Sequence, residues 1–229
     1  ELDAFKGEIA QSVLLQSKNI KTVLNKTSRL EGELRVARFE HLAGNGTVTV
    51  HREFGFVYHL DVSRVFFNSH LGYERMRIAS QVHSGENVFM PFAGVGPFAI
   101  PMASRGARVV ALEKNREACR WLVKNARQND VGGLIEIINA DAFHAAGMLK
   151  MDFDRAVLPI PYGLDHFLEI ILPKVKAGGN LHFYTFKKSH QIAGLKRCYE
   201  DLGLQVIRIR SCGNVAPGVR RWVFDMVKS

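Results

Sequence analysis

The feature that most constrains this chain is a glycine-rich turn between two short apolar runs. The first run, residues 88–92, leads into a stretch at 94–99 that matches the pattern G-x-G-x-x-A. A helix-compatible segment follows, and the second apolar run ends on Glu113, nineteen residues after Gly94. Glycines let the backbone approach a cofactor closely, and a carboxylate ending the second strand can accept hydrogen bonds from ribose hydroxyls. The pattern therefore predicts a βαβ unit that binds an adenosine-type cofactor.

Downstream of Asn87, apolar runs typical of strands alternate with segments typical of helices, which predicts a parallel, doubly wound α/β sheet. The last two expected strands are joined by residues 211–218 without a helix, so they must be antiparallel. A Rossmann-like sheet that ends in an antiparallel hairpin resembles the class I methyltransferase fold. The expected strands are 87–90, 107–113, 135–139, 154–158, 180–186, 205–210 and 219–227, and the expected helices are 96–104, 115–129, 164–176 and 188–203.

The first 75 residues have a different pattern. At 229 residues the chain is long enough for one large domain and a small one. We therefore expect a small α/β domain at 1–75, followed by a cofactor-binding domain at 76–229. In the small domain we expect a helix at 5–16, strands at 20–24, 47–51 and 54–60, and a helix that begins at about Tyr73.

Composition narrows the partners and the compartment. The net charge is +9, and residues 186–229 hold nine Lys or Arg against three acids. Such clustering favours a polyanionic partner such as RNA, although a solvated basic face gives the same count. Three widely spaced cysteines favour a reduced, cytoplasmic compartment without structural zinc. We expect a monomer that binds no metal and no membrane, and, because the chain begins at Glu1 rather than Met, a truncated or processed product.

The glycine motif alone does not distinguish a nicotinamide cofactor from S-adenosylmethionine, but its context favours the latter. No second substrate domain follows the motif, and the expected final strands form a hairpin. In addition, Asp141 follows the third strand, where an acid suits the adenine amino group. Other interpretations stay open, since Asp141 can cap the next helix and Glu113 can pair with Lys114 or Arg116.

These residues, together with motifs upstream, resemble the archaeal and eukaryotic tRNA (guanine-N1)-methyltransferase family, which modifies the guanosine just 3′ of the anticodon. The resemblance covers essentially the whole chain, and it implies S-adenosylmethionine as cofactor and tRNA as partner. The wybutosine-pathway aminocarboxypropyl transferases are a sister group that uses the same cofactor. They usually have tyrosine where this chain has Pro97. The matching stretches are 21–26, 32–35, 38–44, 51–55, 72–78 and 92–98.

The resemblance assigns roles residue by residue. Arg35 aligns with the arginine that holds the carbonyl oxygen of the target guanine, and Glu74 aligns with the proposed general base. Arg35 can instead pair with Glu33 or Glu40, and Glu74 can instead favour a helix dipole. The cofactor-binding set is Phe92, Gly94, Gly96, Glu113, Lys114, Asp141 and Ala142.

A second set of residues, after the fourth expected strand, is expected to contact the substrate. Pro159, Pro161 and Tyr162 lie where open α/β sheets place ligands, and the Tyr162 ring can stack on a flipped base. The two prolines can also simply end the strand.

Two positions depart from the family pattern. Met90 stands where aspartate usually ends the first strand, and Pro159 stands where an Asn-Leu-Pro motif supplies asparagine.

The expected chemistry is removal of the guanine N1 proton by Glu74, most efficient if burial raises its pKa, with Arg35 stabilising the carbonyl oxygen. The departures leave two alternatives open: an aminocarboxypropyl or methyl transfer in the wyosine pathway, and an RNA-binding homologue without catalysis.

Overall fold

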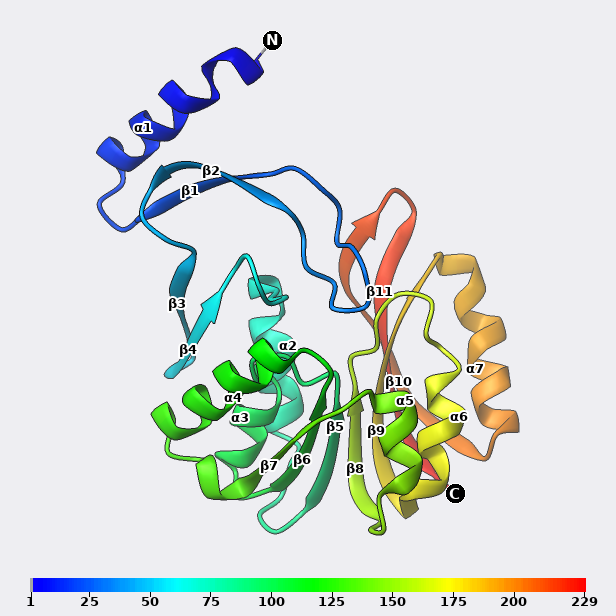
Figure 1. Cartoon of the computed structure of the whole chain (residues 1–229). Helices are drawn as coiled ribbons and strands as arrows, with labels where there is room; N and C mark the ends of the chain where they lie inside the picture. The colour runs from blue at the N-terminus through cyan, green and yellow to red at the C-terminus, as the bar shows by residue number, and fades with distance from the viewer. Residues whose placement is uncertain (1) are drawn as a thin grey trace.

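The computed structural model describes residues 2–229 and places two small antiparallel sheets before a large mixed sheet (Figure 1). A short 3-10 turn at Leu2–Phe5 leads into the first helix. This region contains α1 (Lys6–Gln16), the pair β1 (Thr22–Lys26) and β2 (Phe39–Gly44), the pair β3 (Val48–Glu53) and β4 (Phe56–Asp61), and α2 (Gly72–Ala79).

In the described residues the main sheet has seven strands in the order β10–β11–β9–β8–β5–β6–β7. The strands from β9 to β7 are parallel, and β11 is antiparallel to both of its neighbours. The doubly wound sheet with an antiparallel final hairpin, preceded by a small α/β part, is therefore confirmed. Its strands are β5 (Asn87–Pro91), β6 (Arg108–Glu113), β7 (Ile135–Asn139), β8 (Phe153–Leu158), β9 (Val175–Lys187), β10 (Leu204–Ala216) and β11 (Val219–Lys228).

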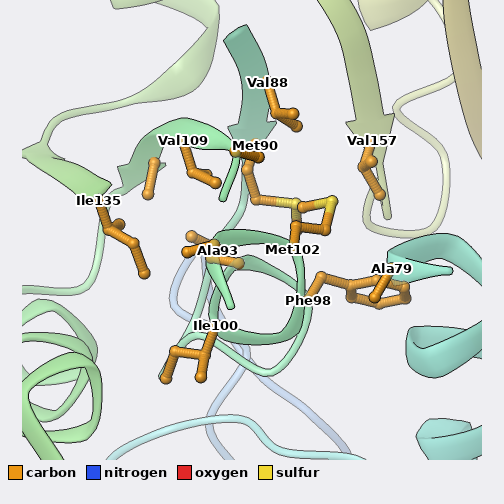
Figure 2. Packing of buried hydrophobic residues seen from close by; sticks show 14 of the residues in the cluster. Ala79, Val88, Met90, Ala93, Phe98, Ile100, Met102, Val109, Ile135 and Val157 are labelled. Carbon is orange, nitrogen blue, oxygen red and sulfur yellow. The ribbon is translucent and has the colours of Figure 1, made fainter. Parts of the chain in front are cut away.

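Helices cover both faces of the main sheet (Figure 1). Because successive strand residues point to opposite faces, Val88 and Met90 of β5 join one buried cluster and Phe89 joins the other. Figure 2 shows the first cluster, in which Met90 packs with Met102 and neighbouring residues of α3. The helices on this face are α2, α3 (Ala99–Ala103) and α4 (Arg116–Gln128), and those on the other are α5 (Ala142–Ala145), α6 (Phe167–Ile171) and α7 (Ile192–Asp201).

The β3–β4 hairpin packs against the main body. The Asn129 side chain hydrogen-bonds both backbone groups of Val57, and Asn125 does the same for His59. Tyr58 between them is fully buried in the same cluster as Met90. The expected domain boundary after residue 75 stays a prediction.

Strand β2 was not expected, and several element boundaries differ from those expected, three of them around α6, β9 and β10. The helix expected over 164–176 is observed as α6 followed by a 3-10 turn at Leu172–Lys174. Pro173 lies in that turn and has no N–H, so it cannot continue the hydrogen bonds of an α-helix. Strand β9 consequently begins at Val175. Strand β10 runs on to Ala216, so the final hairpin turns at Pro217 and Gly218, rather than through a longer loop.

Two further properties bear on partners. Among residues 2–229, none of the helices is both long and apolar enough to cross a bilayer. In the same part of the chain, no three His, Cys, Asp or Glu side chains gather as a metal ion would require.

Candidate functional site

A cavity of about 620 Å³ lies over the carboxyl ends of β5, β6 and β8. Open α/β sheets bind ligands at this edge, and the volume is typical of a small-molecule site. The opposite wall is formed by the loop between β1 and β2, through Leu30 and residues 32–35. The cavity brings together most of the residues expected to act on cofactor or substrate: Arg35, Phe92, Gly94, Glu113, Lys114, Asp141, Ala142, Pro159, Pro161 and Tyr162.

The glycine-rich turn and Glu113 hold each other in place. The backbone N–H of Gly94 donates to Glu113 Oε2 at 2.8 Å, and that of Asn115 donates to Oε1 at 2.7 Å. Burial raises the pKa of Glu113. Neither Lys114 nor Arg116 lies within ion-pair distance of this carboxylate among the described residues, so the alternative of a surface pair is not realised. A carboxylate fixed by backbone donors still has lone pairs for ribose hydroxyls.

Gly96 has a different position from Gly94. It lies outside the cavity, and its backbone has φ of +94°, which favours glycine. A Cβ atom there would come within 2.3 Å of Leu122 Cδ1 and 3.0 Å of Ile100 Cδ1. Gly96 therefore permits close packing of the turn on α4, whereas Gly94 faces the cavity.

Lys114 links three parts of the site. Its ammonium pairs with Glu33 of the β1–β2 loop and, at 2.8 Å, with Asp141 Oδ2. Asp141 Oδ1 also accepts from the Phe143 N–H at 2.9 Å and so caps α5, as the alternative interpretation holds. The ion pair with Lys114 lowers the pKa of Asp141. These groups tie the loop to the part of the cavity at the ends of β6 and β7.

Arg35 is half-buried, and no carboxylate of residues 2–229 forms an ion pair with it. Glu33 binds Lys114 and Glu40 binds Lys6, so neither of the alternative ion pairs of Arg35 forms. Its guanidinium lies over the Phe66 ring, 5.3 Å from the centroid. Its φ is +53°, a region that side-chain-bearing residues rarely adopt and that occurs preferentially at functional sites.

Glu74 does not line the cavity. Its side chain is 2% exposed, and it pairs with Arg77 and Arg210. Burial alone would raise the pKa of Glu74, but hydrogen bonds from Arg77 and Tyr184 outweigh it and lower the value. The raised pKa that would make a stronger base is therefore not found.

Tyr184 connects Glu74 to the cavity. The Tyr184 Oη donates to Glu74 Oε1 at 2.8 Å, and the Tyr184 side chain lines the cavity. Nothing around residue 184 in the sequence marks it, because its partner Glu74 is 110 residues away.

The part of the cavity near the ends of β8 and β9 is aromatic. Pro159 and Pro161 follow β8, and Tyr162 is 66% exposed with its ring centroid 5.8 Å from that of Phe186. The Arg221 guanidinium lies over the Phe186 ring, 5.1 Å from its centroid. An exposed ring at this edge is free to stack on a base.

At the position of the missing aspartate, Met90 is 1% exposed and packs in the core while also touching the cavity. The cavity therefore has a thioether where the family resemblance predicts a carboxylate.

Comparison with models of protein families shows the family to which this chain belongs. The family model described as "TRM5/TYW2 methyltransferase domain" matches residues 49–206, and the model described as "TYW2 N-terminal domain" matches residues 1–47. The chain belongs to the TRM5/TYW2 methyltransferase family. The resemblance stated from the sequence is thus confirmed at the level of the family.

Members of both branches of the TRM5/TYW2 family are similar to this chain. The tRNA (guanine(37)-N(1))-methyltransferase Trm5b of Pyrococcus abyssi is 36% identical over 81% of this chain and 55% of its own length. The tRNA(Phe) (4-demethylwyosine(37)-C(7)) aminocarboxypropyltransferase of Pyrococcus horikoshii is 31% identical over 99% of this chain and 83% of its own. The chain therefore spans about half of the first relative and most of the second.

A solved structure of an aTrm5 complex with tRNALeu has the same fold as this member of the TRM5/TYW2 family. It superposes with a TM-score of 0.89 at 29% identity, covering 99% of this chain and 66% of that one.

Proposed function

We propose that this chain is an S-adenosylmethionine-dependent transferase that methylates guanine N1 at the tRNA nucleotide just 3′ of the anticodon, position 37. The observation that carries the proposal is a single cavity that joins a ribose-type acceptor, Glu113, to an unpaired guanidinium, Arg35, and to the Tyr184–Glu74 pair. Each of these groups answers one requirement of the reaction.

The residues at the β6 and β7 ends fit the cofactor. Glu113 presents a carboxylate held by two backbone N–H groups, as a ribose acceptor should. Leu112, Ala142 and Phe143 give apolar surface beside it for an adenine ring. When bound, S-adenosylmethionine supplies a methyl group on a positively charged sulfur, which is already a strong electrophile. The chain's task is then to align the acceptor and prepare it.

Guanine N1 carries a proton at neutral pH, so that proton must leave before N1 is a nucleophile. Tyr184 Oη can accept it while passing its own proton along the existing hydrogen bond to Glu74 Oε1. Negative charge then develops on the adjacent carbonyl oxygen. Arg35, which pairs with no carboxylate in the described part of the chain, can neutralise it through its donor fork.

A second candidate is transfer of the aminocarboxypropyl group, or methylation of a wyosine precursor, at the same tRNA position. Met90 and Pro159, the two departures from the methyltransferase pattern, support it. So does the Pyrococcus horikoshii relative, of which this chain covers 83%.

Nucleoside mass spectrometry tests the proposal. The purified protein is incubated with S-adenosylmethionine and tRNA that carries guanosine at position 37, and the digested nucleosides are compared with those from tRNA that carries adenosine there. We expect N1-methylguanosine from the first tRNA alone.

The same measurement separates the alternatives, because a methyl and an aminocarboxypropyl group differ in mass. Aminocarboxypropyl product, or product only from tRNA that already carries a wyosine precursor, would support the second candidate. Absence of product from every tRNA, with S-adenosylhomocysteine bound, would contradict the transferase proposal.

A further inference from the structure

Most charged side chains around the cavity already have partners. Lys114 pairs with Glu33 and Asp141, and Arg75 pairs with Glu53. Of the lining residues with basic side chains, that leaves two guanidiniums, Arg35 and Arg221, with no carboxylate within ion-pair distance in residues 2–229.

Both unpaired guanidiniums are partly withdrawn from water. Burial, together with the charge of Arg221, lowers the pKa of Arg35, and burial lowers that of Arg221. Each lies over an aromatic ring, Phe66 for Arg35 and Phe186 for Arg221. Ring stacking covers the face of a guanidinium and leaves its N–H edge for an acceptor in the plane. Because a buried, uncompensated charge is costly, this arrangement calls for electron-rich oxygens in the bound state.

The position of Arg221 in the sheet indicates which molecule brings those oxygens. Arg221 is on β11, and β9, β8 and β5 separate that strand from β6, where Glu113 lies. Four strand spacings amount to about 19 Å. The four-carbon amino-acid arm of a cofactor whose ribose lies at Glu113 is poorly placed to reach so far.

The neighbours of Arg221 point to the RNA instead. Its guanidinium shares the Phe186 ring with Tyr162, the exposed ring that is available to stack on the target base. A nucleotide held there presents two electron-rich groups, its base carbonyl and a flanking phosphate. Arg35 faces the same cavity from the β1–β2 loop, which extends toward β11 in Figure 1. One nucleotide can therefore satisfy both guanidiniums.

We propose that Arg221 binds a phosphate that flanks the target nucleotide, while Arg35 on the opposite wall holds the carbonyl oxygen of its base. Arg221 is thus a positioning residue that fixes the nucleotide from the backbone side. The inference rests on the proposed function, since it takes RNA as the substrate. A guanidinium fork matches two phosphate oxygens, which a lysine ammonium does not.

A double-mutant cycle, which combines substitutions in the protein with changes in the RNA, tests the inference through binding affinities alone. Anticodon stem-loops are synthesised with a neutral methylphosphonate at either phosphate that flanks nucleotide 37. Affinities for wild type, Arg221→Gln and Arg220→Gln are measured with S-adenosylhomocysteine present. Arg220 is the matched control, because it precedes Arg221 on β11 but is exposed and does not line the cavity. Arg221→Lys keeps the charge and removes the fork.

We expect one methylphosphonate to weaken binding to wild type and to Arg220→Gln by about 10-fold, and to have no effect on Arg221→Gln. Arg221→Lys should recover only part of the loss. Equal methylphosphonate effects on wild type and Arg221→Gln would overturn the inference. The inference would also be overturned if Arg221→Gln bound S-adenosylhomocysteine more weakly than wild type but bound 5′-methylthioadenosine, which lacks the carboxylate, equally well. Arg221 would then bind the cofactor.

The proposed function and the proposed role of Arg221 can each be wrong without the other. If the stem-loop binds and the cycle shows coupling but no group is transferred to guanine N1, the function is wrong and Arg221 keeps its role. If N1-methylguanosine forms but the cycle is additive, only the role of Arg221 is wrong. A melting temperature measured for each variant shows whether it is folded, and an unfolded Arg221→Gln leaves Arg221→Lys to decide.

Discussion

At the scale of single residues, the surroundings of two glutamates set them apart. Glu113 touches no cation within residues 2–229, and burial raises its pKa, so it suits an acceptor of ribose hydroxyls. Glu74 is more deeply enclosed, yet Arg77, Arg210 and Tyr184 surround it and its pKa is lowered. Residue type and position alone do not reveal this difference. Arg77 is visible three residues after Glu74, but Arg210 and Tyr184 are 136 and 110 residues away.

The hydroxyl of Tyr184 gives a test at this scale. Tyr184→Phe should lower kcat for methyl transfer by about 10²- to 10⁴-fold, because the path from the cavity to Glu74 is broken. The KM for tRNA and the affinity for S-adenosylhomocysteine should change little. Single-turnover kinetics and calorimetry measure these quantities.

Tyr199→Phe is the matched control. The Tyr199 hydroxyl is buried without a hydrogen-bond partner among the described residues, and its ring packs on Phe183 and Phe224 away from the cavity. This variant should keep the full rate. Full activity in Tyr184→Phe would show that the N1 proton leaves by another path.

At the scale of elements, the glycine turn was the part most predictable from sequence. Its two glycines, the following helix and the acid at the end of β6 all have local signals, and the structure has them in the expected order. Boundaries set by distant contacts were less predictable. Strand β2 forms because β1 pairs with it, and the extended ends of β10 and β11 support each other. The end of α6 could have been found, since Pro173 is a local signal.

Much of the candidate site was also accessible from sequence, because its residues follow strand ends. Asp141 follows the end of β7 by two residues and Tyr162 follows the end of β8 by four, and strand ends of a parallel sheet meet at one edge. Arg221 was not accessible, because it lies near the start of β11, which enters the sheet antiparallel. Its side chain reaches the cavity only because the hairpin folds back onto β9.

The two glycines of the turn should respond differently to alanine. Gly96→Ala should lower the free energy of unfolding by about 2–4 kcal/mol, since it adds backbone strain to the close contact with Leu122 and Ile100. Gly94→Ala meets nothing nearer than the Phe66 carbonyl oxygen at 3.9 Å. It should cost only about 1–2 kcal/mol, from the left-handed backbone. Urea denaturation measures both, and equal losses would contradict the packing role of Gly96.

At the scale of the whole molecule, a buried network of hydrogen-bonded polar and charged side chains runs from α2 through the main sheet. Asp225 accepts from Arg77 at 2.7 Å and from His182 Nδ1 at 2.7 Å, and Arg155 donates to His182 Nε2 at 2.6 Å. Arg155 also pairs with Glu86. Because Arg155 can only donate, His182 Nε2 must accept, so the imidazole is neutral. Burial accordingly lowers the pKa of His182.

Because of this network, the free energy of unfolding at acid pH depends on Asp225. Its hydrogen bonds with His182 and Arg77 outweigh burial and lower the pKa of Asp225 to about 2 from the ordinary 3.8. A carboxyl with a depressed pKa stabilises the fold above its unfolded value and loses that contribution as pH falls. Relative to pH 5, the contribution should therefore be smaller by about 1 kcal/mol at pH 3.

Asp225→Asn tests the linkage. The variant should be less stable than wild type by about 3–5 kcal/mol at pH 7, because Arg77 is left without a carboxylate partner on β11. The difference in free energy of unfolding should narrow from pH 5 to pH 3, as read from urea midpoints. Asp201→Asn, at the exposed end of α7, is the control. A difference that stays constant over this range would show that the pKa of Asp225 is not depressed.

The place of β11 in the sheet has a consequence for synthesis. It lies between β9 and β10 but follows both in sequence, so the ribosome delivers two strands that do not touch before the one that joins them. Until residues 219–228 emerge, the edges of β9 and β10 that face β11 carry unpaired N–H and C=O groups, which other chains can pair with. The central sheet therefore closes only after residue 228 has left the exit tunnel, and a nascent chain stalled after β10 is the species most exposed to aggregation.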